Sequence, residues 1–455
     1  MAERGTLLLV NATPYEWTIS SVSEHGMESW PFVSDQTVVS AGNSATFSIE
    51  FKEGFFHRAD DDVAYATFNL VGTPYSFQVQ AIEQQLRIWL QAIATTGNDV
   101  DGVIDLAWDS KGIMPFFLAG RSGAFSSNNP PMDWMQSNLS TLGSRPLRHL
   151  CMPGTHDSGM STLRAHSALV THKDTITQVH TIGGQLALGA RYFDCRPVIR
   201  GGQYVSGHYA DVKDVGWMGG TGQSFADIVR EINDFTADNA ELVVLNVSHD
   251  LNTDASRSFT QEEWDAFLEL LMGLERLYVA PDPASVDLTL LPLEAFIGNG
   301  DAAVVVIAEP DAKESVSLGA YVSRGVYRYA QLDAYNSYSD THELEKMVHD
   351  QLDKMWNVRQ SPGSQYFLLS WTLTQDALEA IGAGETILSL AAPALPRLYT
   401  KLLPACSPNT YPNIIYLDRF HTSDVVALAM AVNALAGGLI RTDLQDESMN
   451  EILEV

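Results

Sequence analysis

The chain has 455 residues, more than a single hydrophobic core usually organises, so we expect two domains. Its composition, with 45% hydrophobic and 18% charged residues, is that of a globular protein. The 27 basic and 56 acidic residues give a net charge of −29, which argues against nucleic-acid binding and against electrostatic docking on an anionic membrane. An anionic substrate therefore requires a local basic pocket.

Neither end of the chain reads as an export or membrane signal. Residues 1–11 contain a short apolar segment and an acidic residue where a signal peptide carries net positive charge. The apolar run Val425–Ile440 is shorter than a membrane span and predicts a buried final helix. We expect a cytoplasmic protein by default, with secretion as the alternative if a signal was removed. The cysteines have no metal-ligand spacing, which predicts buried thiols without zinc or disulfides: Cys151, Cys195 and Cys406.

Short β-rich runs separated by Gly, Asn and Pro occupy the first part of the chain. Their even spacing predicts an antiparallel β-sandwich, an accessory domain over residues 1–120. The runs are Thr6–Val10, Tyr15–Ser20, Thr37–Val39, Ala45–Phe51, Ala64–Leu70, Tyr75–Gln80, Val103–Trp108 and Phe116–Ala119. Aromatic residues in such a domain form its core more often than a sugar- or lipid-binding site; they include Trp17, Trp30, Phe55, Phe56 and Trp108.

Residues 121–146 are rich in turn formers and are predicted to link the two domains. From residue 147 to 455, strand-like apolar runs alternate with amphipathic stretches such as Ser224–Asn239 and Thr341–Val358. Eight such strands with helices between them predict an α/β fold, the (β/α)8 TIM barrel. The predicted strands are Arg148–Met152, Arg191–Val198, Gln203–Gly207, Glu241–Ser248, Ala302–Ala308, Val326–Leu332, Tyr366–Thr372 and Asn413–Leu417.

A polar cluster follows the first of these strands directly. The stretch Leu150–Met160 breaks an apolar run with Pro153-Gly154 and continues with Thr-His-Asp-Ser, which predicts a strand that opens into a loop. Parallel α/β folds keep their chemistry at such strand ends. His156 supplies a titratable base and Asp157 a group that can orient one. By itself, a His-Asp pair is more often an ordinary loop hydrogen-bonder.

Strand periodicity gathers further polar side chains at the same edge. The two-residue repeat puts Tyr192, Asp194 and Arg196 on one face, pointing into the barrel mouth. A structural salt bridge between the last two is the alternative. The same rule puts His208 at the carboxyl end of the third predicted strand. Seven polar residues are thus predicted at or just beyond carboxyl-terminal strand ends: His156, Asp157, Asp194, Arg196, His208, Asp333 and Asp418.

Two histidines, nearby carboxylates and an arginine suit in-line phosphoryl transfer. One imidazole takes the proton of the attacking hydroxyl, the other protonates the leaving oxygen, and the guanidinium holds the phosphate. A carboxylate behind each imidazole fixes its tautomer. We expect no metal ion or other cofactor, because Arg196 places a fixed positive charge where a cation would sit.

Three motifs in the second half resemble, in the same order, the catalytic boxes of the bacterial-type phosphatidylinositol-specific phospholipase C family of PLC-like phosphodiesterases. They are Met152-Pro-Gly-Thr-His-Asp-Ser-Gly159, Ala190-Arg-Tyr-Phe-Asp-Cys-Arg196 and Ser206-Gly-His208. The first is specific, and the other two gain weight from their order and spacing. The resemblance covers residues 133–455 and implies cleavage of phosphatidylinositol or a related glycerophosphodiester, first to a cyclic inositol phosphate. The expected partner is a phospholipid, with peripheral membrane contact.

The resemblance also implies roles for individual residues. His156 would deprotonate the inositol 2-hydroxyl with Asp418 as its partner. His208 would protonate the diacylglycerol oxygen with Asp157 behind it. The phosphate and the attacking hydroxyl would be bound by Arg196 and Asp194. Further head-group contacts are implied for an Asp-x-Tyr pattern and considered for one more histidine: Asp333, Tyr335 and His249.

Two departures from the family pattern put inositol specificity in doubt. The chain reads Asn246-Val-Ser-His-Asp250 where the family has a lysine, and Ile307-Ala-Glu-Pro310 where an arginine follows the fifth strand. Two other functions remain open. One is a metal-dependent glycerophosphodiesterase, against which Arg196 argues. The other is a lipid- or sugar-binding protein with an inactive barrel, against which the intact histidines argue.

Overall fold

The computed structural model describes residues 3–32, 37–52, 62–167, 170–311, 316–375 and 385–438. Their contacts group the chain into two compact units. Unit 1 comprises residues 1–131, 396–411 and 423–455, and unit 2 comprises residues 132–395 and 412–422. Within the described ranges no helix combines the length and the apolar character needed to cross a membrane.

Two β-sheets form the N-terminal part of unit 1. One has the strand order β10-β9-β1-β4 and the other β3-β2-β5-β6-β7-β8. Contrary to a purely antiparallel arrangement, β1 pairs in parallel with β9. The strands are β1 (Glu3–Ala12), β2 (Trp17–His25), β3 (Val38–Val39), β4 (Ser44–Phe51), β5 (Val63–Leu70), β6 (Ser76–Ile82), β7 (Gln85–Trp89), β8 (Val103–Asp105), β9 (Ile113–Arg121) and β10 (Ala124–Ser127).

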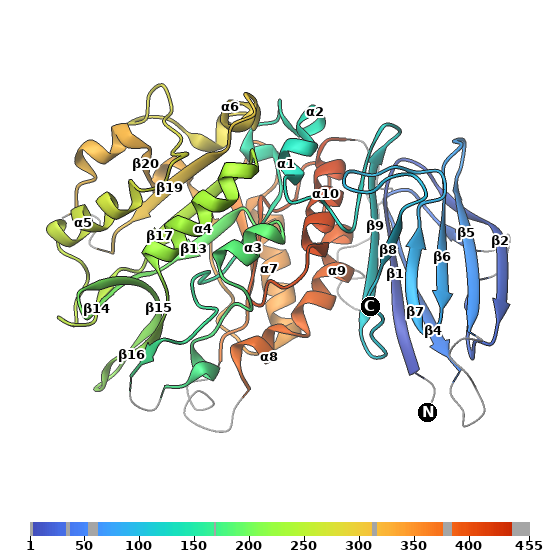
Figure 1. Cartoon of the computed structure of the whole chain (residues 1–455), viewed down its shortest axis with the longest axis horizontal. Helices are drawn as coiled ribbons and strands as arrows, with labels where there is room; N and C mark the ends of the chain where they lie inside the picture. The colour runs from blue at the N-terminus through green and yellow to red at the C-terminus, as the bar shows by residue number, and fades with distance from the viewer. Residues whose placement is uncertain are drawn as a thin grey trace. The chain divides into compact units, whose positions relative to one another are not determined.

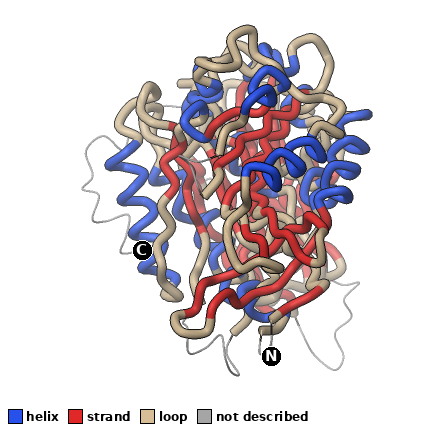
Figure 2. Tube along the Cα trace, turned by 90° about the vertical axis from the view of Figure 1, so that its left-hand side faces the viewer, coloured by secondary structure: helices blue, strands red, loops and turns tan. Residues whose placement is uncertain are grey.

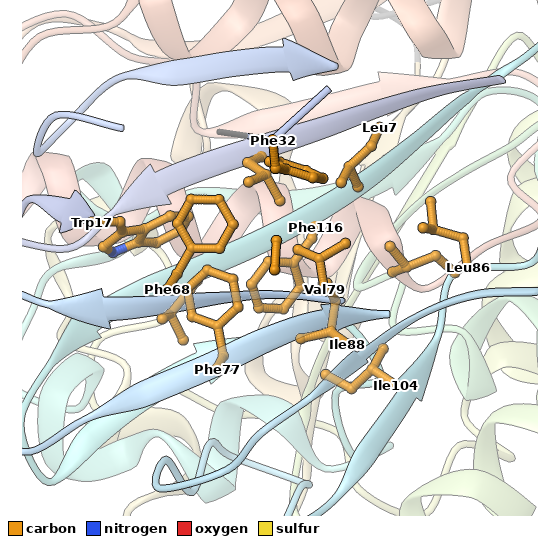
Figure 3. Packing of buried hydrophobic residues seen from close by; sticks show 14 of the residues in the cluster. Leu7, Trp17, Phe32, Phe68, Phe77, Val79, Leu86, Ile88, Ile104 and Phe116 are labelled. Carbon is orange, nitrogen blue, oxygen red and sulfur yellow. The ribbon is translucent and has the colours of Figure 1, made fainter. Parts of the chain in front are cut away.

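One hydrophobic cluster draws on both sheets of unit 1. Alternate residues of β6 are buried, as expected for a strand with one apolar face. Figure 3 shows Phe68 and Phe77 of the larger sheet beside Phe116 of the smaller one. Trp17 belongs to this core, and Trp30 and Trp108 pack against it. Phe55 and Phe56 lie outside the described residues.

The last helix of unit 1 is buried, as its sequence predicts. Helix α10 (Asp424–Ala436) has buried side chains on all its faces. Its first carboxylate accepts a hydrogen bond from Asn128 Nδ2 (2.7 Å), close to the end of β10. Residues 121–131, expected to be part of a linker, therefore belong to a packed unit.

Unit 2 is built on a curled sheet of eight parallel strands, so the fold of the chain is mixed α/β (Figure 1). The strand order is β20-β19-β17-β13-β11-β23-β22-β21. The sequence predicts a closed barrel, whereas β20 and β21 are the two ends of this order among the described strands. The strands are β11 (Met152–Thr155), β13 (Tyr192–Cys195), β17 (Leu242–Ser248), β19 (Ala303–Glu309), β20 (Val326–Arg328), β21 (Ala334–Asn336), β22 (Tyr366–Trp371) and β23 (Ile414–Leu417).

Three of the predicted strands differ from the observed ones. The predicted first strand, Arg148–Met152, begins with a 3₁₀ turn, and β11 starts only at its last residue, so Pro153 and Gly154 lie inside the observed strand. The predicted third strand, Gln203–Gly207, lies outside the parallel sheet, in the long strand β15 of a second sheet. The predicted sixth strand, Val326–Leu332, is interrupted by a 3₁₀ turn and supplies β20, with β21 following it. The number of parallel strands remains eight because one predicted strand is lost and β21, which lies just beyond the predicted sixth strand, is added.

The second sheet of unit 2 has five strands in the order β12-β16-β15-β14-β18 (Figure 1). Its main part is a hairpin of β15 and β16, to which β14 adds antiparallel. Sequence patterning mistook β15 for a barrel strand because a short apolar run looks the same in both sheet types. The strands are β12 (Ala165–His166), β14 (Pro197–Arg200), β15 (Gln203–Val212), β16 (Gly216–Ser224) and β18 (Leu251–Asn252).

Helices follow most of the parallel strands and lie mainly at the periphery in Figure 2. Helix α5 (Gln261–Leu271) is capped by Thr260, whose hydroxyl accepts from the Glu263 amide while the Glu263 carboxylate accepts from the Thr260 amide. The helix buries one apolar stripe, which includes Trp264, Phe267 and Leu271. The helices are α1 (Trp134–Ser137), α2 (Leu139–Leu142), α3 (Ile182–Ala187), α4 (Phe225–Asp238), α5 (Gln261–Leu271), α6 (Glu294–Ile297), α7 (Leu344–Val358), α8 (Ile387–Ala391) and α9 (Ala394–Ala405).

Candidate active site

Four of the residues predicted for the site directly follow the last residue of a parallel strand. They come after β11, β13, β17 and β23 and are His156, Arg196, His249 and Asp418. Because the carboxyl ends of parallel strands meet at one edge of the sheet, the four residues share that edge. This edge is the one that the sequence predicts for catalysis.

His156 and Asp418 form a hydrogen-bonded pair. The imidazole Nδ1 lies 2.7 Å from Asp418 Oδ1, and the carboxylate is almost fully buried. Burial opposes protonation of the ring, but the Asp418 carboxylate outweighs it and raises the pKa of His156 above its ordinary value. The pair joins two strand ends that are 262 residues apart in the sequence.

Arg196 acts against Asp418 and favours the neutral form of His156. Its Nη2 lies 2.8 Å from His156 Nε2. A guanidinium can only donate hydrogen bonds, so Nε2 accepts and the ring is neutral with its proton on Nδ1, pointing at Asp418. His156 is therefore in the form that can accept a proton from a substrate hydroxyl.

His208 and Asp157 form a second pair. His208 Nδ1 lies 2.7 Å from Asp157 Oδ2, and the carboxylate is fully buried. Contrary to the prediction, His208 is not at the end of a parallel strand, because the β15–β16 hairpin carries it to the site. Its ring centroid is 6.3 Å from that of His156, with the planes at 81°. One phosphodiester can therefore contact both imidazoles, each over a hydrogen bond of about 2.6–3.2 Å.

Asp194 lies beneath Arg196. Its Oδ2 is 3.5 Å from Arg196 Nη2 and accepts a 2.5 Å hydrogen bond from the Tyr416 hydroxyl. Burial alone would raise the pKa of Asp194, but Arg196 and then His156 lower it to about 2. Arg196 is also 3.7 Å from Asp157, and these carboxylates raise the pKa of the guanidinium despite its burial. The alternative salt bridge between Asp194 and Arg196 is thus present, within a larger cluster.

Several buried polar atoms around this cluster have no hydrogen-bond partner among the described residues. They are Asp157 Oδ1, Arg196 Nε, Tyr192 Oη and Asn246 Oδ1. Asn246 pairs in register with Asp194, so both side chains face the inside of the sheet. Buried polar groups are normally paired, so these atoms are available to a polar ligand or solvent.

The three residues predicted to contact the head group lie in different parts of unit 2. His249 lies at the edge of the site, with its Nδ1 2.8 Å from Ser248 Oγ. Burial of the imidazole, and then the positive charge of Arg196, lower the pKa of His249. Asp333 precedes β21, at the amino end of its strand, and accepts from Gln365 Nε2 (3.1 Å). The structure therefore places Asp333 at the opposite edge from His156, which corrects the prediction.

Tyr335 also faces away from the candidate site. It is in register with Phe367 of β22, and the two rings stack with centroids 5.5 Å apart. On β22, Ser370 is in register with Tyr416, whose hydroxyl points to Asp194 inside the sheet. Phe367 and Ser370 are an odd number of residues apart, so Phe367 and Tyr335 lie on the outer face.

Sequence analysis gave no role to Thr177 and Gln178, which lie behind the site. Gln178 Nε2 donates to the carbonyl oxygen of His156 (2.7 Å), and Thr177 Oγ1 donates to that of Asp157 (2.9 Å). Both residues are fully buried. Their burial is visible only in the structure, and the surrounding residues form no motif that could have suggested them.

Among the described residues, no group of three or more His, Cys, Asp or Glu side chains is arranged to hold a metal ion. The carboxylates nearest to Arg196 are Asp157 and Asp194, each already within 4 Å of the guanidinium. Independence from metals remains a prediction. We expect activity to survive exhaustive chelation and to gain nothing from added calcium; a rate that collapses with chelator and returns with calcium would instead make the two carboxylates metal ligands.

The Asp418→Asn variant tests the His156 pair by its pH dependence. In the wild type, the acid limb of kcat/KM should be centred above the ordinary histidine pKa of about 6.5, because Asp418 raises the pKa of His156 and the base must be neutral. In the variant, burial and Arg196 remain, and both lower this pKa. The limb should therefore move to lower pH while the maximal rate falls; an unmoved limb would assign it to another group.

No family model matches the sequence, and no curated protein matches it. Among solved structures, the chain is similar to a mutant phosphatidylinositol-specific phospholipase C from Staphylococcus aureus, at 14% identity over 67% of this chain and 96% of that chain, with a TM-score of 0.46. The phosphatidylinositol-specific phospholipase C from Listeria monocytogenes is similar at 14% identity over 64% and 95%, with a TM-score of 0.46. The likeness is distant, and the function proposed below depends on this chain's own residues.

Proposed function

We propose that the protein is a phosphodiesterase that cleaves phosphatidylinositol or a related glycerophosphodiester by histidine acid–base catalysis. The observation that carries this proposal is the pair of His-Asp dyads with one arginine between them. Arg196 lies 2.8 Å from His156 and 3.7 Å from Asp157, the partner of His208. A phosphate bound to the guanidinium would therefore have one imidazole within reach on each side.

The proposed reaction has two proton transfers. His156 Nε2 takes the proton of the substrate hydroxyl as that oxygen bonds to phosphorus. The phosphorus–oxygen bond to the diacylglycerol breaks, and His208 in its charged form gives a proton to the leaving oxygen. The product is a cyclic phosphate, which water opens when the two histidines exchange roles. Asp418 and Asp157 hold the rings by Nδ1 and leave Nε2 for the chemistry.

Arg196 and Asp194 would bind the reacting groups. The guanidinium has a fork of donors that fits two phosphate oxygens and offsets the negative charge that develops on them. With a pKa of about 2, Asp194 stays ionised and can accept the hydrogen bond of the attacking hydroxyl before His156 takes its proton. The resemblance to the phospholipase C family implies the same division of roles.

The head group of the substrate is inferred from the residues that stand where the family has cationic ones. Asn246 faces the inside of the sheet, and Glu309 ends β19 next to it in register with Ser248. Neither can supply the positive charge that the family pattern places in these strands. We therefore propose a polyol head group without further phosphates, and His249 as its neighbour at the rim.

We assign catalysis to unit 2, which contains the parallel sheet of the (β/α)8 barrel predicted over residues 147–455, and an accessory role to residues 1–120 as a β-sandwich. All the proposed catalytic side chains lie in unit 2. The paired sheets of unit 1 share one apolar core, which supports the sandwich assignment. Phospholipid is the proposed partner, met at the membrane surface without an electrostatic contribution from this acidic chain.

Phosphorus NMR of the product formed from phosphatidylinositol tests the proposed function. A cyclic inositol phosphate as first product is the expected result. An open phosphate from the start would favour direct attack by water, as in a glycerophosphodiesterase. If no phosphodiester in a panel of glycerophospholipids is cleaved, the alternative of a binding protein with an inactive barrel gains support.

A further inference from the structure

A buried strap, residues 176–178, contacts the loop after β11 and the loop after β23. Its last residue, Gln178, is fully buried and makes three hydrogen bonds with main-chain groups. Its Nε2 donates to the carbonyl oxygens of His156 (2.7 Å) and Leu417 (3.0 Å). Its Oε1 accepts from the amide of Phe420 (3.0 Å). One side chain thus forms hydrogen bonds with the backbone at His156 and on both sides of Asp418.

Thr177 makes the matching contacts one residue earlier in the strap. Its hydroxyl donates to the carbonyl oxygen of Asp157 (2.9 Å), and its own carbonyl accepts from the amide of Arg419 (2.8 Å). The two residues that it holds, Asp157 and Arg419, have φ angles of +40° and +53°. Non-glycine residues adopt this left-handed region only where surrounding contacts hold them, and Thr177 supplies such contacts.

These contacts fix the relative position of two strand ends. The direct link between them is the His156 amide, which donates to the Leu417 carbonyl (2.9 Å). The Leu417 carbonyl also accepts a hydrogen bond from Gln178 Nε2. The side chain of Gln178 thus completes a small hydrogen-bond network around the His156–Asp418 pair. A carboxylate–imidazole hydrogen bond weakens steeply when its angle or distance changes. The network therefore controls the contact that raises the pKa of His156.

We infer that Gln178 is a positioning residue for the base dyad, His156 and Asp418. It acts through backbone atoms and does not touch substrate. The inference rests on the proposed function for its effect on rate, but its effect on the titration of His156 can be measured without any substrate.

Gln178→Met removes all three hydrogen bonds at nearly the same side-chain volume. We expect kcat to fall about 10²-fold, the loss typical of a small displacement of a catalytic group, with little change in KM. We expect the acid limb of kcat/KM to move to lower pH, because a looser Asp418 contact raises the pKa of His156 less. NMR titration of the His156 imidazole in the free protein should show the same downward shift.

Gln178→Glu gives a second variant in case the methionine variant does not fold. A protonated carboxylic acid at this position can donate a hydrogen bond to the carbonyl oxygen of His156 or of Leu417. The ionised carboxylate has no hydrogen to donate, so it would lie against both carbonyl oxygens without a hydrogen bond and be repelled by them. The His156 titration should therefore be closer to that of the wild type at low pH and should depart from it as the introduced carboxyl group ionises.

The matched control is Gln351→Met. Gln351 is also fully buried; its Nε2 donates to the Ser337 carbonyl (2.9 Å), and its Oε1 accepts from the Ser370 amide (2.9 Å). Its loss should lower the melting temperature and leave the His156 titration unchanged. If both methionine variants lose stability alike and neither moves that titration, Gln178 is only structural and the inference is wrong. If the titration shifts but no phosphodiester is cleaved by the wild type, the inference stands and the proposed function fails.

Discussion

Replacing His156 or His208 by alanine should lower kcat by about 10²–10⁴-fold each, the usual contribution of a general acid or base. Both side chains are partly exposed and lie at a strand end or on a hairpin, so the variants should keep the wild-type circular dichroism spectrum. Steady-state rates on the substrate found by phosphorus NMR provide the measurement. A variant that keeps the wild-type rate would remove that histidine from the mechanism.

The two histidines can be told apart by the leaving group. A diester with an acidic phenol as leaving group needs little protonation, so His208→Ala should recover much of its activity on it. His156→Ala should not, because the attacking hydroxyl still has to lose its proton. The matched control is His166→Ala: His166 is exposed, and its Nδ1 lies 2.9 Å from the carbonyl oxygen of the next residue. Equal recovery of both variants would contradict the separate roles.

Arg196→Lys should lower kcat/KM by at least about 10²-fold, comparable to the loss of an oxyanion donor in other enzymes. The charge is kept, but an ammonium group cannot present the planar fork that holds two phosphate oxygens while bridging His156 and Asp157. The measurement is kcat/KM on the same substrate, together with the melting temperature. Arg196→Met should lose more, because Asp157 and Asp194 then face each other without a cation between them.

Arg200→Lys is the control for this variant. Arg200 is half-buried at the end of β14, only four residues further along, and its Nη1 donates to the Tyr209 hydroxyl (3.1 Å). It should keep wild-type kcat/KM. If Arg196→Lys is as active as Arg200→Lys, the guanidinium is not bound to the phosphate and its role is to hold the carboxylates together.

Local sequence patterns were sufficient for the parts of the site that depend on one strand. The polar residues after Pro153-Gly154 predicted a loop, and His156 does follow the last residue of β11, although Pro153 and Gly154 themselves lie within that strand. The two-residue repeat of a strand put Asp194 and Arg196 on the same face, and the structure has them 3.5 Å apart. Each of these conclusions concerns the direction of side chains along a single element, which backbone geometry alone decides.

Predictions from the sequence were wrong where they depended on which strands are neighbours in a sheet. Apolar alternation in Gln203–Gly207 could not tell a barrel strand from a strand of the second sheet, so the route by which His208 reaches the site was wrong. The Asp-x-Tyr pattern matched at Asp333 and Tyr335, but a 3₁₀ turn before β21 moves the first to the opposite edge and the register with β22 turns the second outward.

By itself, the sequence determined the alternation of strands and helices in the second half, the polar residues at its strand ends and the acidic charge that confines anion binding to a local pocket. Only the tertiary structure decided which of these residues meet. Asp418 reaches His156 because β23 is the neighbour of β11, and Gln178 joins their loops from a segment without any pattern. The physical reason is that periodicity fixes the direction of a side chain on its own strand, whereas contacts between distant residues depend on strand order and loop packing.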